Sequence, residues 1–265
     1  MAERTNGDIY AGIVGPVRTG KSTFIKRFME LLVLPNIDDY HKKERAKDEL
    51  PLSGSGKTIM TTEPKFVPNE AAELTIMDKV KFKVRMVDCV GYLVKGALGH
   101  EENQMARMVS TPWFDEDIPF ESAAEIGTKK VITDHSTIGF VVTTDGSITD
   151  IERSNYIEAE ERVITELKEL EKAFIIILNT KHPELDTTKA LKSSLEDKYG
   201  VSVVAMDCLN MSIENIEEIF KILLYEFPVK ELSINLPGWI EGLSKEHWVR
   251  KEVMEMLKES IVNLH

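Results

Sequence analysis

A short segment near the N-terminus, Gly15–Thr23, has the residue types and spacing of a loop that binds phosphate. It satisfies the pattern G-x-x-x-x-G-K-[ST] between an apolar run and a helical pattern. In such a loop backbone N–H groups wrap the phosphates, Lys21 reaches the β- and γ-phosphates, and the Ser22 hydroxyl coordinates Mg²⁺. A chance match in a tight turn is the alternative. The candidate nucleotide contacts are all residues of the loop: Gly15, Pro16, Val17, Arg18, Thr19, Gly20, Lys21, Ser22 and Thr23.

A second motif, Asp88-Cys89-Val90-Gly91, follows the apolar run that ends at Val87. It has the D-x-x-G form, in which the acid anchors the water shell of the metal and the glycine N–H contacts the γ-phosphate. The alternative is that Asp88 caps the next turn. We therefore expect Asp88 and Gly91 to complete the phosphate site.

Two threonines, Thr61 and Thr62, lie between these motifs in the segment Lys57–Pro64. A switch threonine here would complete the Mg²⁺ shell and respond to the γ-phosphate, although both can also be ordinary loop residues. The sequence does not choose between them. The candidate metal ligands are Ser22, Thr62 and Asp88, and the candidate catalytic residues are Arg18, Lys21, Thr61, Thr62 and Asp88.

The elements that must position these motifs alternate between strand-like and helical patterns, which indicates an α/β fold. We expect a P-loop NTPase fold with a mostly parallel sheet and helices on both faces. The predicted strands are Ile9–Val14, Lys65–Ile76, Phe82–Val90, Thr137–Thr143, Phe174–Leu178 and Val201–Met206. The predicted helices are Lys21–Leu34, Phe120–Asp134, Ser154–Leu170, Thr188–Tyr199 and Ile213–Phe227.

Three segments depart from this alternation. Asn36–Lys57 and Gly91–Pro119 are long and polar or rich in glycine, and such loops are usually functional or disordered. After Pro228, a strand-like stretch, Glu231–Leu236, and an amphipathic helix from Ser244 leave the nucleotide-domain pattern. We therefore expect a domain over 1–228 and the start of a following region over 229–265. Because the last helix reaches the chain end without a cap, we expect the chain to be cut there.

Composition narrows the class of protein. The chain has 265 residues, 42% of them hydrophobic, and can bury a large core. A formal charge of -12 provides no broad positive field, which argues against nucleic acid as a partner. There is no apolar signal-peptide core and no run of about 18 apolar residues, so we expect a cytosolic chain without a transmembrane segment. Cys89 and Cys208 are then most simply reduced core residues.

The two phosphate motifs resemble those of the translation-factor-related class of P-loop NTPases, whose usual member is a GTPase. That class reads guanine with an N/T-K-x-D motif after the fifth strand. Here the strand is followed by Asn179-Thr180-Lys181-His182-Pro183, and with Thr180-Lys181 as the T-K pair the aspartate position is Pro183. Losing that pairing favours ATP, although Glu184 as a substitute leaves GTP open. Asn179 and Lys181 remain candidate nucleotide contacts.

Arg18 lies inside the string R-T-G-K-S, which resembles the phosphate loop of the guanylate-binding proteins. The resemblance implies an internal arginine finger, whose guanidinium would neutralise charge that develops during phosphoryl transfer. The alternative is a solvated or ion-paired loop residue.

Longer strings carry a more specific resemblance. The chain resembles the stage IV sporulation protein A family, the spore-coat morphogenetic ATPases of endospore-forming Firmicutes, over nearly all of its length. The strings are GDIYAGIVGPVRTGKSTFIKRFMELLVLPNI, GKTIMTTEPKFVPN, VDCVGY, STIGFVVTTDGSITDI, YIEAEERVI and YEFPV. Departures in Asp38–Lys47, around Leu93–Gly96 and in His182–Tyr199 remove no phosphate-site residue.

The resemblance implies a function and partners that the residues alone do not. Its members hydrolyse ATP, with Mg²⁺, to polymerise on the forespore surface from the mother-cell cytoplasm, and they form the basement layer of the coat. Docking to a small amphipathic membrane peptide and to coat-assembly proteins is implied for a C-terminal part that this chain lacks. Two alternatives stay open: a regulatory GTPase switch that recruits a partner, and a nucleotide-stabilised scaffold without enzymatic activity.

Overall fold

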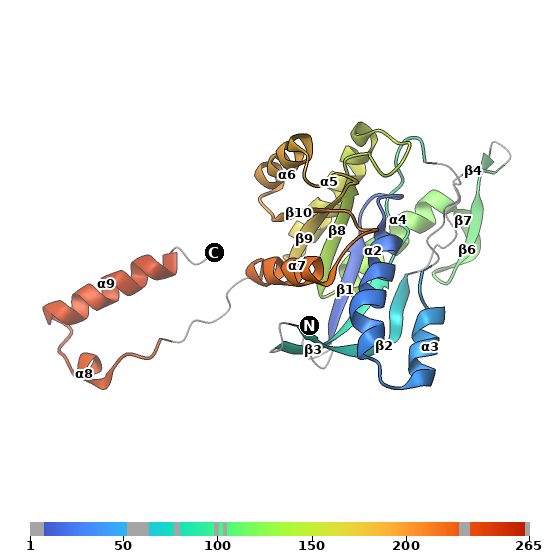
Figure 1. The fold of residues 1–265 in the computed structure, drawn as a ribbon. Coiled ribbons are helices and arrows are strands. Elements are labelled where there is room, and N and C mark those ends of the chain that lie inside the picture. Colours follow the sequence, from blue (N-terminus) through green and yellow to red (C-terminus); the bar gives the residue numbers. More distant parts are fainter. Residues whose placement is uncertain are drawn as a thin grey trace. The chain divides into compact units, whose positions relative to one another are not determined.

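Buried strands form a six-stranded sheet in the computed structural model, which describes residues 8–51, 64–76, 80–97, 101–102, 105–227 and 234–262. The strand order is β10-β9-β8-β1-β3-β2, and all neighbours are parallel except β2, which runs antiparallel to β3 (Figure 1). The prediction of a mostly parallel sheet is confirmed. The strands are β1 (Ile9–Val14), β2 (Lys65–Ile76), β3 (Val80–Asp88), β8 (Ile138–Thr144), β9 (Phe174–Asn179) and β10 (Val203–Met206).

Helices cover both faces of this sheet, as predicted. One core contains buried side chains of α2, α3 and α7, and the core on the other face contains those of η3, α5 and α6. Strands such as β8 are buried along their whole length because both faces are covered. The helices are α2 (Lys21–Phe28), η1 (Met29–Val33), η2 (Leu34–Asn36), α3 (Tyr40–Asp48), α4 (Phe120–Lys130), η3 (Val131–His135), η4 (Arg153–Tyr156), α5 (Ile157–Glu169), α6 (Asp186–Tyr199) and α7 (Ile213–Tyr225).

Both segments that the sequence indicated as long loops contain regular structure. The first contains α3, whose N-cap Asp39 accepts a hydrogen bond from Lys42 N at 2.9 Å. Ala46 is the one buried residue of α3, which is described throughout. A helix that buries so little of its surface needs no apolar stripe, and its sequence therefore shows no helical periodicity. The second contains two antiparallel pairs: β4 (Glu101–Glu102) with β5 (Met105–Ala106), and β6 (Met108–Thr111) with β7 (Phe114–Pro119).

The chain divides into two compact units, Met1–Glu226 and Phe227–His265. The second contains α8 (Gly238–Glu241) and α9 (Trp248–Val262), the latter within the helix expected from Ser244. Of the strand-like stretch Glu231–Leu236, only residues 234–236 are described, and they belong to no strand.

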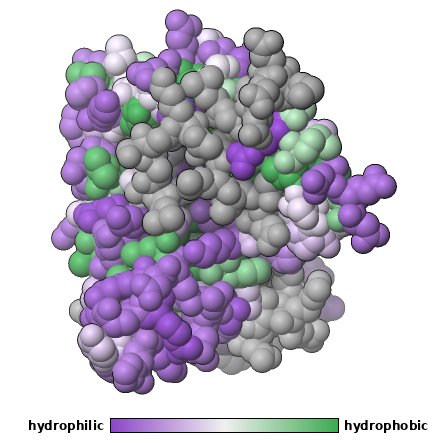
Figure 2. Space-filling model, turned by 90° about the vertical axis from the view of Figure 1, so that its right-hand side faces the viewer, coloured by the Kyte–Doolittle hydropathy of each residue, from purple (hydrophilic) through white to green (hydrophobic). Residues whose placement is uncertain are grey.

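One face of the molecule is largely polar where its residues are described (Figure 2). Hydrophilic residues dominate the described part of the face in Figure 2, with smaller hydrophobic patches among them. No helix within the described ranges is long and apolar enough to span a bilayer.

The core on the α2 and α7 face provides a test of packing. Phe140 is fully buried, and its ring centroid lies 5.8 Å from that of Phe24 and 5.9 Å from that of Phe220. Replacing Phe140 by Ala removes these contacts and leaves a cavity, so the free energy of unfolding should fall by about 3–5 kcal/mol. Urea denaturation measures this loss. The control Phe114→Ala, at a side chain that is 49% exposed, should change stability little.

Candidate phosphate-binding site

The loop between β1 and α2 encloses the Lys21 ammonium. Lys21 is 5% exposed, and its Nζ donates hydrogen bonds to the carbonyl oxygens of Pro16 at 2.6 Å and Gly15 at 3.3 Å. Burial lowers the pKa of Lys21, while the charge of Asp88 acts in the opposite direction. The Thr19 hydroxyl also donates to Pro16 O, at 3.0 Å, and tightens the loop. A phosphate oxygen that displaced these carbonyl oxygens would meet a buried ammonium at the N-terminus of α2, where negative charge is favoured.

Asp88 stands at the end of β3, beside the first residues of α2. Its Oδ2 accepts a hydrogen bond from Ser22 Oγ at 3.3 Å, whereas its Oδ1 is buried and has no hydrogen-bond partner among the described residues. Burial raises the pKa of Asp88 to about 6, opposed by Lys21 and Ser22. A buried carboxylate oxygen without a partner is costly, so this position favours a cation.

A magnesium ion fits this donor set. Within the described residues no group of three or more His, Cys, Asp or Glu side chains could hold a metal. Magnesium often binds through one or two protein oxygens together with water and phosphate oxygens, so it does not need such a cluster. Ser22 and Asp88 would supply the protein oxygens.

Gly91 lies against the phosphate loop so closely that only glycine fits. A Cβ on Gly91, whose φ is +94°, would lie 2.2 Å from Gly15 O and 2.5 Å from Lys21 Nζ. Its N–H donates to Thr128 Oγ1 of α4 at 3.1 Å, so a contact of this N–H with a γ-phosphate requires the peptide to turn. The sequence did not indicate that Thr128 would accept a hydrogen bond from Gly91, because threonine is common in helices and Thr128 lies far from both motifs in the sequence.

Arg18 adopts an unusual backbone conformation in the loop. Its φ of 63° lies in the left-handed region that residues other than glycine rarely adopt, and its side chain is half-buried. No ion pair joins Arg18 to another residue in the described part of the chain. Strain of this kind persists where the surrounding structure enforces it, often at functional sites.

Asn179 and Lys181 are positioned differently from each other. Asn179 is 4% exposed, and its Nδ2 donates to Thr19 O at 2.9 Å while its Oδ1 accepts from Cys208 N at 3.1 Å. It therefore supports the phosphate loop from β9. Lys181 is exposed, and its backbone N–H donates to Ser147 Oγ at 3.0 Å.

The residue that would read guanine is not acidic in either possible register. Counted from Thr180, the fourth motif position is Pro183, and counted from Asn179 it is His182. Glu184, the possible substitute, has a side chain that is 92% exposed and pairs with Lys189 at 3.7 Å. Two predicted site residues, Thr61 and Thr62, lie outside the described residues, whereas Thr23 lies in the first turn of α2 and is half-buried.

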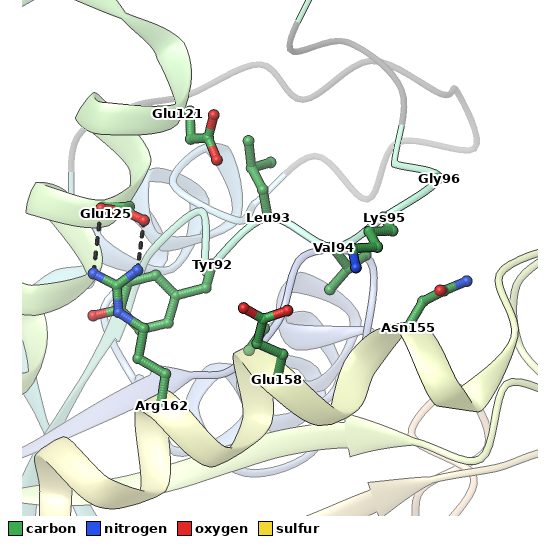
Figure 3. Close-up of a pocket in the computed structure, with 11 residues that line it drawn as sticks. Tyr92, Leu93, Val94, Lys95, Gly96, Glu121, Glu125, Asn155, Glu158 and Arg162 are labelled. Atoms are coloured by element: carbon green, nitrogen blue, oxygen red, sulfur yellow. Dashed lines mark hydrogen bonds and ion pairs between the residues drawn. The ribbon is translucent and has the colours of Figure 1, made fainter.

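A pocket of about 390 Å³ adjoins the segment that follows Gly91 (Figure 3). Arg162 of α5 lies on one side of it, pairs with Glu125 of α4, and has its guanidinium carbon 4.1 Å from the Tyr92 ring centroid. The Tyr92 hydroxyl donates to Glu166 Oε2 at 2.7 Å, and Tyr92 O accepts from Val17 N at 2.9 Å. Tyr92 thus connects the phosphate loop to α5.

Comparison with known proteins is consistent with this geometry. Residues 1–228 match the family model described as "Stage IV sporulation protein A, ATPase domain". Proteins named Stage IV sporulation protein A from Clostridioides difficile (strain 630), Bacillus subtilis (strain 168) and Bacillus anthracis are 59%, 54% and 52% identical over 264 residues. Each match covers 100% of this chain and 54% of the relative, so the chain spans about half the length of these relatives. The chain belongs to the stage IV sporulation protein A family.

Proposed function

We propose that this chain is the ATP-hydrolysing part of a morphogenetic protein of the spore coat. The observation that carries the proposal is the convergence of Lys21, Ser22, Asp88 and Gly91 at the ends of the neighbouring parallel strands β1 and β3. Phosphoryl transfer depends mainly on positioning and on neutralising charge, and these residues are of the types that do both. Membership of the family supports the choice of reaction.

Each residue has a distinct part in the proposed reaction. The Lys21 ammonium would pair with the β- and γ-phosphates, and Ser22 and Asp88 would hold Mg²⁺, which when bound neutralises charge on the phosphates. Gly91 would contact the γ-phosphate, and Thr61 or Thr62 would respond to it from the switch segment. The Arg18 guanidinium would act on the bridge between the β- and γ-phosphates, where charge develops.

ATP is the proposed nucleotide because neither His182 nor Pro183 can accept the paired hydrogen bonds of guanine through a carboxylate. A regulatory GTPase is the competing function, and a scaffold that only binds nucleotide is a third. Purified chain supplied separately with ATP and GTP, with phosphate release as the readout, tests all three. Faster turnover of ATP supports the proposal, faster turnover of GTP supports the switch, and binding without turnover supports the scaffold.

In the longer protein, we propose that the nucleotide cycle drives self-assembly into the basement layer of the coat. The resemblance of the sequence supports a location in the mother-cell cytoplasm, at the forespore surface, and contacts with a small amphipathic membrane peptide and coat-assembly proteins. Assembly of the full-length protein with ATP should exceed assembly with a non-hydrolysable analogue. Equal assembly in both would contradict coupling to hydrolysis.

Lys21→Ala should abolish or strongly weaken nucleotide binding, because it removes the buried ammonium from the centre of the loop. Titration with a fluorescent ATP analogue measures the affinity. Lys26→Ala is the matched control, since Lys26 lies on the same helix with a side chain that is 41% exposed. Near-normal binding by Lys21→Ala would place the phosphates elsewhere.

Asp88→Asn should retain part of the ATP affinity but turn over more slowly, because the amide keeps the shape of the side chain and removes the charge that would hold Mg²⁺. The magnesium concentration for half-maximal turnover should rise by about tenfold or more, since a charged ligand is lost. The readout is phosphate release over a magnesium titration. An unchanged midpoint would assign the metal to another acid.

Arg18→Ala should lower kcat while the ATP affinity stays within a few-fold, because a finger acts mainly on the transition state. A fully engaged finger is worth roughly 10³–10⁵ in rate, and we expect a loss of about tenfold or more here. Arg18→Lys tests whether charge alone suffices. If kcat of Arg18→Ala stays within about twofold of the parent value, Arg18 does not act as an arginine finger. A loss of ATP affinity without a loss of kcat would mean that Arg18 binds the phosphates in the ground state.

A further inference from the structure

The loop after β8 is joined to the loop after β9 by a side-chain cluster that we call the Asp145 clasp, formed by Asp145, Ser147 and Thr180. Asp145 Oδ2 accepts from Thr180 Oγ1 at 2.6 Å. Asp145 Oδ1 accepts from Ser147 N at 2.9 Å and from Ser147 Oγ at 2.6 Å. Both carboxylate oxygens therefore accept hydrogen bonds from neighbouring residues of the two loops.

The clasp fixes backbone on the β9 side. Ser147 Oγ accepts from Lys181 N at 3.0 Å, and Thr180 Oγ1 accepts from His182 N at 3.1 Å. Thr180 is fully buried, so its hydroxyl needs an acceptor, and a carboxylate gives a stronger bond than a neutral oxygen. Without Asp145, the peptides of Lys181 and His182 would keep their partners but lose the group that holds those partners in place.

The strand order indicates which part of a bound nucleotide would lie over the backbone of Lys181 and His182, namely the nucleoside. β3, which supplies Asp88 and precedes Gly91, lies on one side of β1, whereas β8 and β9 lie on the other. A nucleotide whose terminal phosphate met Asp88 and Gly91 would therefore extend over the ends of β8 and β9. The phosphate loop comes close to these strand ends at Gly20. A Cβ on Gly20 would lie 2.2 Å from Asn179 Nδ2 and 3.8 Å from Ile148 Cδ1.

We propose that Asp145 is a positioning residue that, through Ser147 and Thr180, shapes the surface that receives the purine nucleoside and contributes to the choice of base. The inference rests on the proposed function. Because neither His182 nor Pro183 supplies a carboxylate, discrimination between bases depends on fixed backbone groups and packing at this end. Asp145 holds that backbone without contact with the phosphates.

The test compares Asp145→Ala with Asp150→Ala, which removes an exposed acid from the same loop. Asp145→Ala should raise the Kd and KM for ATP by about tenfold and leave kcat within about twofold of the parent. The preference for ATP over GTP, measured as the ratio of the two kcat/KM values, should fall by about threefold or more. Asp150→Ala should behave as the parent. Thr180→Val should change the Kd and KM in the same direction as Asp145→Ala, because both variants remove the bond from Thr180 Oγ1 to Asp145 Oδ2. The loss in the double variant should be smaller than the sum of the two single losses, since that bond is shared.

Folded Asp145→Ala with the Kd, KM and nucleotide ratio of the parent would overturn the inference, as would a loss in kcat alone. If near-UV circular dichroism shows that Asp145→Ala is unfolded, Asp145→Asn replaces it, because the amide keeps the side-chain volume and the same criteria apply. If the parent binds ATP but does not hydrolyse it, the proposed function fails, and the Kd values for ATP and GTP still decide the role of Asp145.

Discussion

The parallel pairing of β1 with β3 is the constraint on which the phosphate site depends. Ile13 pairs with Asp88, so both strands end at the same edge of the sheet and the segments that follow come into contact. Val17 N donates to Tyr92 O at 2.9 Å, and Gly91 fits beside Gly15 because it has no side chain. This contact brings the buried Lys21 ammonium near the half-buried Asp88 carboxylate. Both groups lose hydration there, so a bound phosphate and a bound cation would stabilise them.

The candidate site residues that depend on local spacing could be named from the sequence alone, and their roles stay predictions. The phosphate loop requires particular residues between one strand and one helix, and Asp88 follows directly from a buried strand, so both could be recognised without a structure. The strands were predictable because burial on both faces gives continuous apolar runs such as Phe174–Leu178. Element ends differed by a few residues, as expected where caps and tight turns decide them.

Features that depend on contacts distant in sequence could not be predicted. Thr128 meets Gly91, and Asp145 meets Thr180, only because the sheet brings their elements together. The helix α3 was missed for another reason: its residues are polar nearly all round, so periodicity gave no signal. Asp39 as a preceding N-cap was the local indication available.

The two ends of the site are held by different kinds of interaction, and this difference bears on how nucleotide choice can change. At the phosphate end one of the contacts, Val17 N to Tyr92 O, joins two backbone groups, and substitution of a side chain cannot easily remove it. At the other end the bond between Asp145 and Thr180 joins two side chains. A change of Asp145 would alter the surface proposed to receive the base, while the sheet and the contacts within the phosphate loop stay intact. On the proposed role of Asp145, the choice of purine could therefore change without rebuilding the phosphate loop.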